Sequence, residues 1–463
     1  MANAIAAVKR MFVNKRGETD MTEGSIFRHL LTFALPLLIG NVFQMLYNTV
    51  DTWVVGNYVS SEAFEAVGSV GPMINLLIGF FSGLASGAGV VISQYFGAGQ
   101  EDKVKKTVHT AVTLTAILSL VFTAIGLLLI PLLLDVANIP ARVAPEATTY
   151  LSIYFSGITG LLFYNMGAGI LRAVGDSTKP FLFLVASAVI NTVLDLVFVL
   201  GCGMGVDGVA YATIIAQGVS ALLIVITLVR TRSCVQLSFR HIGLDWTILK
   251  KIFRVGIPAA LQMAITSFSN VFVQSYINGI DDGVAMGGWT AYGKIDQLLL
   301  LPAQSLALAS TTFLGQNLGK NLVDRAKTGL RTALYMSVVT AVVLMIPVMI
   351  FAPHLVRFLN DDPDTVRYGT MFLRWISPFY VLCCFNQVYA GGLRGAGNSR
   401  APMIIMLSSF VVYRQVYLFV VSNFISNTII PITMAYPTGW LLASLLTWIY
   451  YRRVNLAKTR LVD

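Results

Sequence analysis

The sequence contains few charged residues. Asp, Glu, Lys and Arg make up 12% of its 463 residues, whereas soluble domains contain about 25%. This shortage excludes a solvated globular surface over most of the chain. Hydrophobic residues reach 56%, and many apolar runs exceed about 18 residues, the length that a membrane-spanning helix needs. Because these runs are continuous rather than alternating, they predict transmembrane helices.

Cysteine and histidine are scarce, with four of each. The cysteines lack metal-ligand spacing, and we interpret them as small hydrophobic residues. The histidines form no HExxH motif, and the chain has no GxxxxGK[ST] loop. These absences argue against an intramembrane metalloprotease and an ATP-driven machine. We therefore expect no enzyme and no cofactor.

The basic residues, which give a net charge of +10, gather in alternate loops rather than on one soluble surface. They cluster near residues 103–106, 230–254 and 320–331 and in both tails, whereas the other loops are acidic, as at Glu62, Glu65 and Asp361. Positive charge stays in the cytoplasm, so both termini are expected there. We expect a multi-pass protein of a bacterial plasma membrane, monomeric, with the lipid bilayer but no nucleic acid as partner.

Twelve membrane spans are expected. They lie near residues 30–56, 66–95, 108–134, 147–171, 180–200, 207–229, 252–278, 287–315, 330–352, 368–393, 402–424 and 430–451. The fold class is therefore an all-α integral membrane protein.

The spans form two halves that repeat with a constant offset of 222 residues. The matches include Pro36 with Pro258, Asn48 with Asn270, Gln94 with Gln316, and Arg172 with Arg394. Since six spans per half is an even number, both halves share one orientation and are expected to be related by an axis along the membrane normal. Such halves typically hold a substrate cavity between them.

This repeat predicts five regions. A polar, basic N-terminal tail without a signal peptide covers 1–28, and the six-helix bundle of the N-half covers 29–230. A cytoplasmic loop follows at 231–250, then the six-helix bundle of the C-half at 251–452 and a short tail at 453–463.

Asp51 lies in the first apolar stretch, LLTFALPLLIGNVFQMLYNTVDTWVVG. A carboxylate at the centre of a span costs roughly 3 kcal/mol or more, so it marks a functional site by default. Asp195 is a second such carboxylate, and the repeat places Val273 and Tyr417 at the equivalent positions of the C-half. This asymmetry predicts a cation or proton site in the N-half.

Three polar residues accompany these carboxylates. Asn191 precedes Asp195 by four residues and shares its helical face, Thr213 lies in the next span, and Asn165 lies in the span before. Hard oxygen ligands of this kind suit Na⁺, particularly at Asp51, Asp195 and Asn191, and the carboxylates alone suit H⁺. For Asn165, Asn191 and Thr213 individually, interhelical hydrogen bonding is an equal alternative.

The C-half has its own intramembrane charges at Lys294 and Asp296. Positions i and i+2 do not face each other on a helix, so we expect no mutual ion pair. Each residue either pairs with another helix or serves the cavity or C-half coupling. Arg374 and Arg414 are expected to pair or to extend toward the membrane surface.

These residues resemble the MATE family of multidrug and toxic compound extrusion transporters. The similarity extends over nearly the whole chain. Its local matches are LPLLIGNVFQMLYNTVDTWVVG, SQYFGAGQEDKVKKTVHTA, LRAVGDSTKP with its repeat LRGAGNSRAP, and NTVLDLVFVLGCGMGVDGVAYAT, which is the most specific. The resemblance implies a V-shaped pair of bundles that exports organic cations or drugs in exchange for Na⁺ or H⁺. It also implies an N-half cation site at Asp51, Asn165, Asn191, Asp195 and Thr213.

Three alternatives remain. A lipid-linked oligosaccharide flippase of the same superfamily would usually show fourteen spans and a more cationic cavity. A major facilitator protein would carry a GxxxDRxGR-like signature after the second span, where this chain reads GAGQEDKVKK. A membrane scaffold or receptor would not require paired intramembrane carboxylates.

Overall fold

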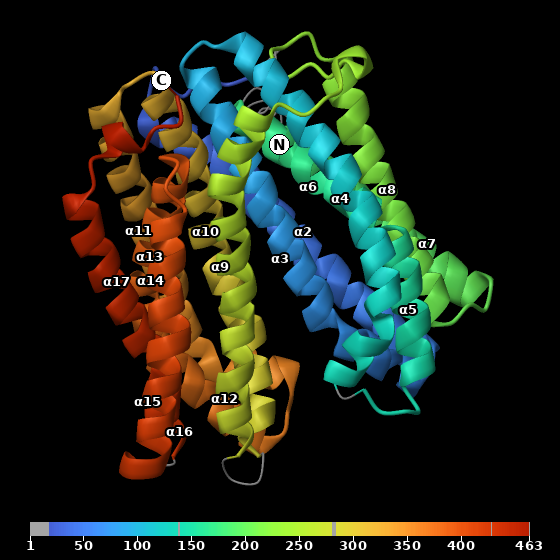
Figure 1. The fold of residues 1–463 in the computed structure, drawn as a ribbon. Helices are drawn as coiled ribbons and strands as arrows, with labels where there is room; N and C mark the ends of the chain where they lie inside the picture. The colour runs from blue at the N-terminus through green and yellow to red at the C-terminus, as the bar shows by residue number, and fades with distance from the viewer. Residues whose placement is uncertain (1–17, 138, 280–283, 427, 463) are drawn as a thin grey trace, which may run out of the picture. The chain divides into compact units, whose positions relative to one another are not determined.

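The computed structural model describes residues 18–137, 139–279, 284–426 and 428–462, apart from the side chains of residues 265–268, 271, 272 and 278. The described residues form helices joined by short loops (Figure 1). Most of the predicted N-terminal tail, residues 1–17, lies outside them, as does residue 463 of the C-terminal tail.

The N-half contains seven α-helices and one π-helical turn. They are α2 (Ile26–Tyr58), α3 (Ser61–Gly97), α4 (Glu101–Val136), α5 (Ala144–Ser156), α6 (Ile158–Ala173), α7 (Thr178–Leu196), η1 (Val197–Gly201) and α8 (Val206–Arg230). A short 3₁₀ turn, η2 (Phe239–His241), lies in the loop before the C-half.

The C-half follows the same order with more interruptions. Its helices are α9 (Trp246–Asn278), α10 (Ala285–Gly319), α11 (Val323–Leu359), α12 (Pro363–Ile376), α13 (Tyr380–Gly395), α14 (Arg400–Met406), α15 (Arg414–Val420), α16 (Ile429–Thr433) and α17 (Ala435–Arg453). Short 3₁₀ or π-helical turns connect or follow them: η4 (Ser377–Phe379), η5 (Leu407–Tyr413), η6 (Val421–Ile425) and η7 (Leu456–Thr459).

The predicted helical spans are confirmed. Within the described residues, 9 helical stretches are long and apolar enough to cross a membrane. The remaining predicted spans correspond to α9 and to the broken pairs α5–α6 and α12–α13. One break falls at Gly157, where a Cβ atom would lie 2.4 Å from Ile214. The other falls at Ser377–Phe379, where Pro378 cannot donate a helical hydrogen bond.

Equivalent positions of the two halves make equivalent contacts. A Cβ atom on Gly169 would lie 2.9 Å from the Ala85 carbonyl oxygen, and one on Gly391 would lie 2.3 Å from the Ala307 carbonyl oxygen. Both pairs follow the offset of 222 residues. Gly175 and Gly397, another matched pair, adopt φ values of 85° and 88°, a region that favours glycine.

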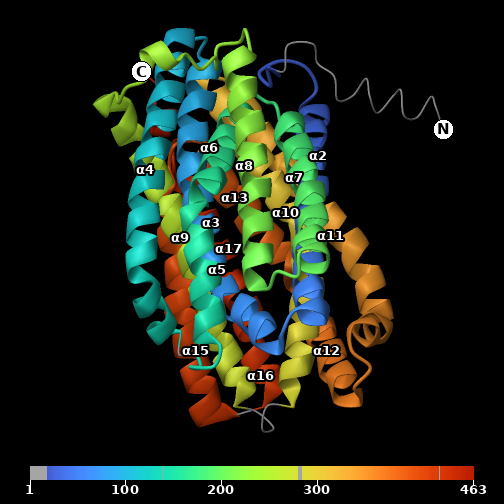
Figure 2. The same ribbon diagram turned by 90° about the vertical axis from the view of Figure 1, so that its right-hand side faces the viewer.

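Residue contacts divide the chain into two compact units, and two of the three boundaries lie inside helices α2 and α9. Among the described residues, the first unit comprises 18–20 and 35–260, and the second comprises 21–34 and 261–462. The start of α2 therefore belongs to the second unit, and the start of α9 belongs to the first. Each unit has its own apolar core, with α8 contacting α6 and α7 in the first (Figure 2).

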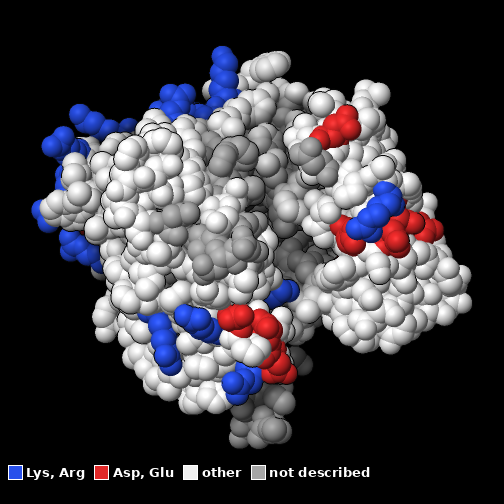
Figure 3. Space-filling model, turned by 90° about the horizontal axis from the view of Figure 1, so that it is seen from below, with Lys and Arg blue, Asp and Glu red and all other residues white. Residues whose placement is uncertain are grey.

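Acidic side chains gather at one end of each unit, beside basic ones (Figure 3). In the loops of the first unit, an Arg142 nitrogen lies 2.5 Å from a Glu65 oxygen, and this carboxylate raises the pKa of Arg142. In the second unit, Asp362 caps α12 by accepting a 2.8 Å hydrogen bond from the Thr365 backbone N–H, which lowers the pKa of Asp362. Both pairs lie outside the spans.

Small residues let α3 and α9 approach closely within the first unit. A Cβ atom on Gly83 would lie 2.4 Å from the Ala260 backbone, and one on Gly87 would lie 2.5 Å from the Gly256 Cα. Helices in membranes associate through such close packing because lipid tails are as apolar as their side chains.

Because α3 and α9 are so close at this crossing, adding one methyl group there should clearly lower the stability of the protein. Gly87→Ala should lower the thermal stability of the detergent-solubilised protein, since overpacking typically costs about 1–3 kcal/mol. Gly68→Ala, on the same helix, is the matched control because its Cβ atom would meet nothing within 4 Å. Equal unfolding temperatures for the two variants would contradict the close contact.

Candidate functional site

The structure brings the two N-half carboxylates together. Asp51 extends from α2, and Asp195 lies on the last turn of α7 with no exposed surface. Their side chains are near enough to interact electrostatically. Even so, Asp51 Oδ1 and both Asp195 carboxyl oxygens are buried without a hydrogen-bond partner among the described residues. Buried carboxyl oxygens without partners are costly and invite a proton or a cation.

Asn191 belongs to the same polar group. It is buried on α7, one helical turn before Asp195, and both atoms of its side-chain amide lack a partner within the described chain. The α-helix gives way to the π-helical turn η1 immediately after Leu196. Such turns occur frequently at functional sites.

Two tyrosines and a glutamine that sequence reasoning missed complete the group. Tyr150 and Tyr154 stack on α5 with ring centroids 6.3 Å apart. Tyr150 is close to both Asp51 and Thr213, while Tyr154 is close to Gln217 of α8. The Tyr154 hydroxyl and Gln217 Oε1 are further buried atoms without partners among the described residues. In the sequence these residues are recognisable only as polar side chains inside predicted spans, with Tyr150 and Tyr154 four residues apart on one helical face.

Thr213 and Asn165 are arranged differently. Thr213 is buried on α8 and donates its hydroxyl to the Val209 carbonyl at 3.0 Å, which leaves the oxygen able to accept from Tyr150. The Asn165 amide donates to the Leu161 carbonyl of its own helix, α6, at 2.9 Å. No recorded contact in the described chain joins Asn165 to the carboxyl pair, so its assignment rests on the resemblance alone.

The site is rich in hydrogen-bond acceptors and contains two carboxyl groups. The described residues hold no group of three or more His, Cys, Asp or Glu side chains with metal-binding geometry. This composition is poor in the nitrogen and sulfur ligands that transition metals prefer. Carboxylate, amide and hydroxyl oxygens fit Na⁺ or H⁺ instead.

Asp296 of the C-half has its hydrogen bonds satisfied. Its Oδ1 accepts from the Tyr292 hydroxyl at 3.0 Å and from the Tyr380 hydroxyl. Lys294 is exposed and forms no ion pair with Asp296, as the spacing predicts.

Arg414, on α15, is buried in the second unit with only 1% of its surface exposed. Its Nη1 donates to Ser269 Oγ at 3.3 Å and to Asn270 Oδ1 at 3.2 Å, and its guanidinium lies 4.3 Å from the Tyr436 ring centroid. Arg414 thus reaches into the core, stacked on an aromatic ring. The apolar stretch around it gives no hint of these partners.

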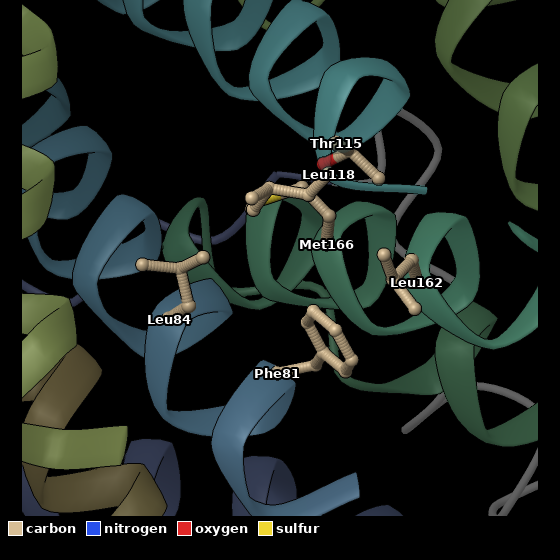
Figure 4. Close-up of a pocket in the computed structure, with 6 residues that line it drawn as sticks. All are labelled: Phe81, Leu84, Thr115, Leu118, Leu162 and Met166. Carbon is tan, nitrogen blue, oxygen red and sulfur yellow. The ribbon is translucent and has the colours of Figure 1, made fainter. Parts of the chain in front are cut away.

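A small apolar cavity lies elsewhere in the first unit, between α3, α4 and α6 (Figure 4). It is lined by Phe81, Leu84, Thr115, Leu118, Leu162 and Met166. None of these side chains titrates, so we attribute the cavity to imperfect packing.

Comparison with known proteins identifies the family. The MatE family model matches residues 36–197 and 258–420, two ranges that begin at the matched residues Pro36 and Pro258. The chain belongs to the MatE family. Its fold, with twelve predicted spans in two bundles, is that of MatE transporters, and the protein is a transporter rather than an enzyme.

Similar proteins cover nearly the whole chain. The probable multidrug resistance protein YpnP of Bacillus subtilis (strain 168) is 30% identical over 94% of this chain and 96% of its own. YoeA, a probable multidrug resistance protein of the same strain, is 29% identical over 95% and 96%. A solved structure of a multidrug resistance MATE family transporter, described as outward-facing, superimposes with a TM-score of 0.90 at 24% identity. It covers 96% of this chain and 99% of its own.

Neutralising Asp195 and neutralising Asp296 should have different effects on thermal stability. Asp195→Asn should leave the unfolding temperature unchanged or raise it, since the buried carboxyl oxygens lack partners. Asp296→Asn should lower stability by about 1 kcal/mol, because the tyrosine hydroxyls lose a charged acceptor. Thermal unfolding in sodium-free detergent buffer at alkaline pH measures both. A larger loss in Asp195→Asn than in Asp296→Asn would contradict the unpartnered site.

Proposed function

We propose that this MatE transporter is a secondary multidrug efflux protein that exports organic cations or drugs in exchange for Na⁺ or H⁺. The observation that carries the proposal is the pair of half-buried Asp51 and buried Asp195. Asp51 Oδ1 and both Asp195 carboxyl oxygens have no hydrogen-bond partner among the described residues. The names of the similar proteins, which describe multidrug resistance, support the substrate class.

The pair offers a coupling step with a physical basis. Two neighbouring carboxylates repel each other when both are ionised, and a proton or Na⁺ between them removes that repulsion. Because the pair joins α2 to α7, this change alters how the two helices pack. Coupling requires only that the ion bind one state of the transporter more tightly than the other. The ion enters as substrate leaves, and the halves alternate in access to the two sides.

The remaining residues take secondary places in this proposal. Asn191, Thr213 and Tyr150 supply further oxygens for Na⁺ or orient the carboxyl groups for a proton. Asn165, bonded to its own helix, is the weakest member. Asp296, held by two tyrosines, remains a candidate for C-half coupling, and Lys294 a candidate for the cavity.

Transport in proteoliposomes tests the central claim. Wild-type protein should move ethidium when a Na⁺ gradient or a pH gradient is imposed separately, and the effective gradient names the ion. Asp51→Asn and Asp195→Asn should abolish this driven transport while expression and folding persist. Asp135→Asn, at the exposed end of α4, is the control for loss of one carboxylate and should transport normally.

Two outcomes would redirect the proposal. Wild-type transport by both Asp51→Asn and Asp195→Asn would remove the pair from coupling. Folded, correctly inserted wild-type protein that responds to neither gradient would favour the flippase alternative and lipid-linked substrates.

The proposed orientation places both termini in the cytoplasm of a bacterial cell. A fluorescent protein fused after residue 462 should fluoresce, because that domain folds only on the cytoplasmic side. Alkaline phosphatase fused after Asn360, between α11 and α12, should be active outside. The reverse pattern would overturn the orientation that the loop charges predict.

A further inference from the structure

The segment that precedes α2 is seated firmly on the second unit. We call residues 21–25 the α2 leader. Met21 and Thr22 are almost completely buried, and the Met21 N–H donates to Gln316 Oε1 of α10 at 2.9 Å. Asn317 of the same helix donates to the Met21 carbonyl at 3.3 Å. All of these residues belong to the second unit.

Arg325 of α11 fixes this leader. Its Nη2 lies 3.1 Å from the Met21 carbonyl oxygen and 2.9 Å from those of Glu23 and Gly24. Lys320 adds contacts of 3.1 Å to Thr22 Oγ1 and to Glu23 Oε1. An arginine fork that gathers several carbonyl oxygens holds a turn far more rigidly than one exposed ion pair does.

The helix that follows the leader passes into the other unit. Residues 21–34 belong to the second unit, whereas α2 from Leu35 onward belongs to the first and carries Asp51. The beginning of this continuous helix is therefore held by Arg325, whereas its carboxylate Asp51 lies among the residues of the first unit.

The repeat shows the reciprocal arrangement. The loop before α9 is held by α4 of the first unit, where the Ser238 N–H donates to His109 Nε2 at 3.0 Å. The Asp245 N–H donates to Thr110 Oγ1 at 3.2 Å, and α9 then passes into the second unit at Leu261. Both α2 and α9, the first helices of the two halves, are thus held at their beginnings by one unit before they pass into the other. This recurrence indicates that the attachment has a role beyond local packing.

We propose that Arg325, assisted by Lys320, is a positioning residue that couples the state of Asp51 to the second unit. The inference rests on the proposed ion-driven transport. When the carboxyl pair takes up or releases its ion, α2 shifts, and the fixed leader transmits that shift to α10 and α11. Without the fork, the beginning of α2 moves independently, and the free energy of ion binding no longer biases the second unit.

Arg325→Ala tests this coupling. Gradient-driven ethidium transport should fall at least about fivefold, the lower range of typical coupling factors. Ethidium binding to the purified protein, followed by fluorescence anisotropy, should stay within about twofold of the wild-type affinity, well inside that coupling range. Arg325→Lys should retain intermediate transport, because an ammonium group donates to the same carbonyls without the planar fork.

Two further variants guard against a trivial result. Lys327→Ala removes a neighbouring charge of α11 whose ammonium lies 3.9 Å from Asp324 of the same helix, and it should transport normally. Lys320→Ala spares the fork and should show a smaller loss in the same direction, which keeps the proposal testable if Arg325→Ala fails to fold.

Each outcome has a defined meaning. Full driven transport by Arg325→Ala overturns the proposal, as does full transport by Lys320→Ala if Arg325→Ala does not fold. A loss of transport matched by an equal loss of ethidium binding overturns it too. Asp51→Asn in the same vesicles separates the two claims. If it transports normally, the proposed function fails; if it is inactive while Arg325→Ala is normal, only the coupling role of Arg325 fails.

Discussion

The structure depends on the cost of placing a polar group where water cannot reach it. Most polar side chains inside the spans avoid that cost locally, as Thr213 and Asn165 do by bonding to carbonyls of their own helices. Asp51 and Asp195 do not, and buried carboxyl oxygens that lack hydrogen-bond partners usually have a function. The two halves differ in this respect, because Asp296 has two hydroxyl donors. Among the intramembrane carboxyl groups that the structure describes, only those of the N-half have oxygens without hydrogen-bond partners.

The same constraint shapes how the helices meet. Since lipid offers no hydrophobic gain for helix association, contact area must come from close approach. Glycines at positions 83 and 87 bring α3 against α9, while Gly169 and Gly391 repeat one contact in the two halves. Large apolar residues such as Leu120 and Leu128 instead remain exposed on α4. Small residues mark these closest helix contacts, whereas the exposed large residues of α4 mark a surface that faces lipid.

Much of the architecture could be predicted from the sequence, because hydrophobic runs and the offset of 222 residues are strong signals. The carboxyl pair was also predictable, since a charged residue inside a span is rare. Tyr150, Tyr154 and Gln217 were not, because tyrosine and glutamine in a span do not reveal which helix they will face. Arg414 was expected to pair or extend to the surface, whereas its partners are neutral side chains and an aromatic ring. The partners of a side chain depend on tertiary contacts, which cannot be read from a single sequence.

The beginnings of α2 and α9 belong to the unit of the opposite half, which limits how this fold can be divided. If each half were a separate chain, the segment at the beginning of its first helix would pack on the other chain. Neither chain could then complete its structure alone. Two copies of an ancestral six-helix protein would have exchanged the beginnings of their first helices as a domain-swapped dimer exchanges an element. Fusion into one chain would then have preserved the swap inside a single polypeptide. The unit boundaries at residues 34 and 260 are the trace that such a history would leave.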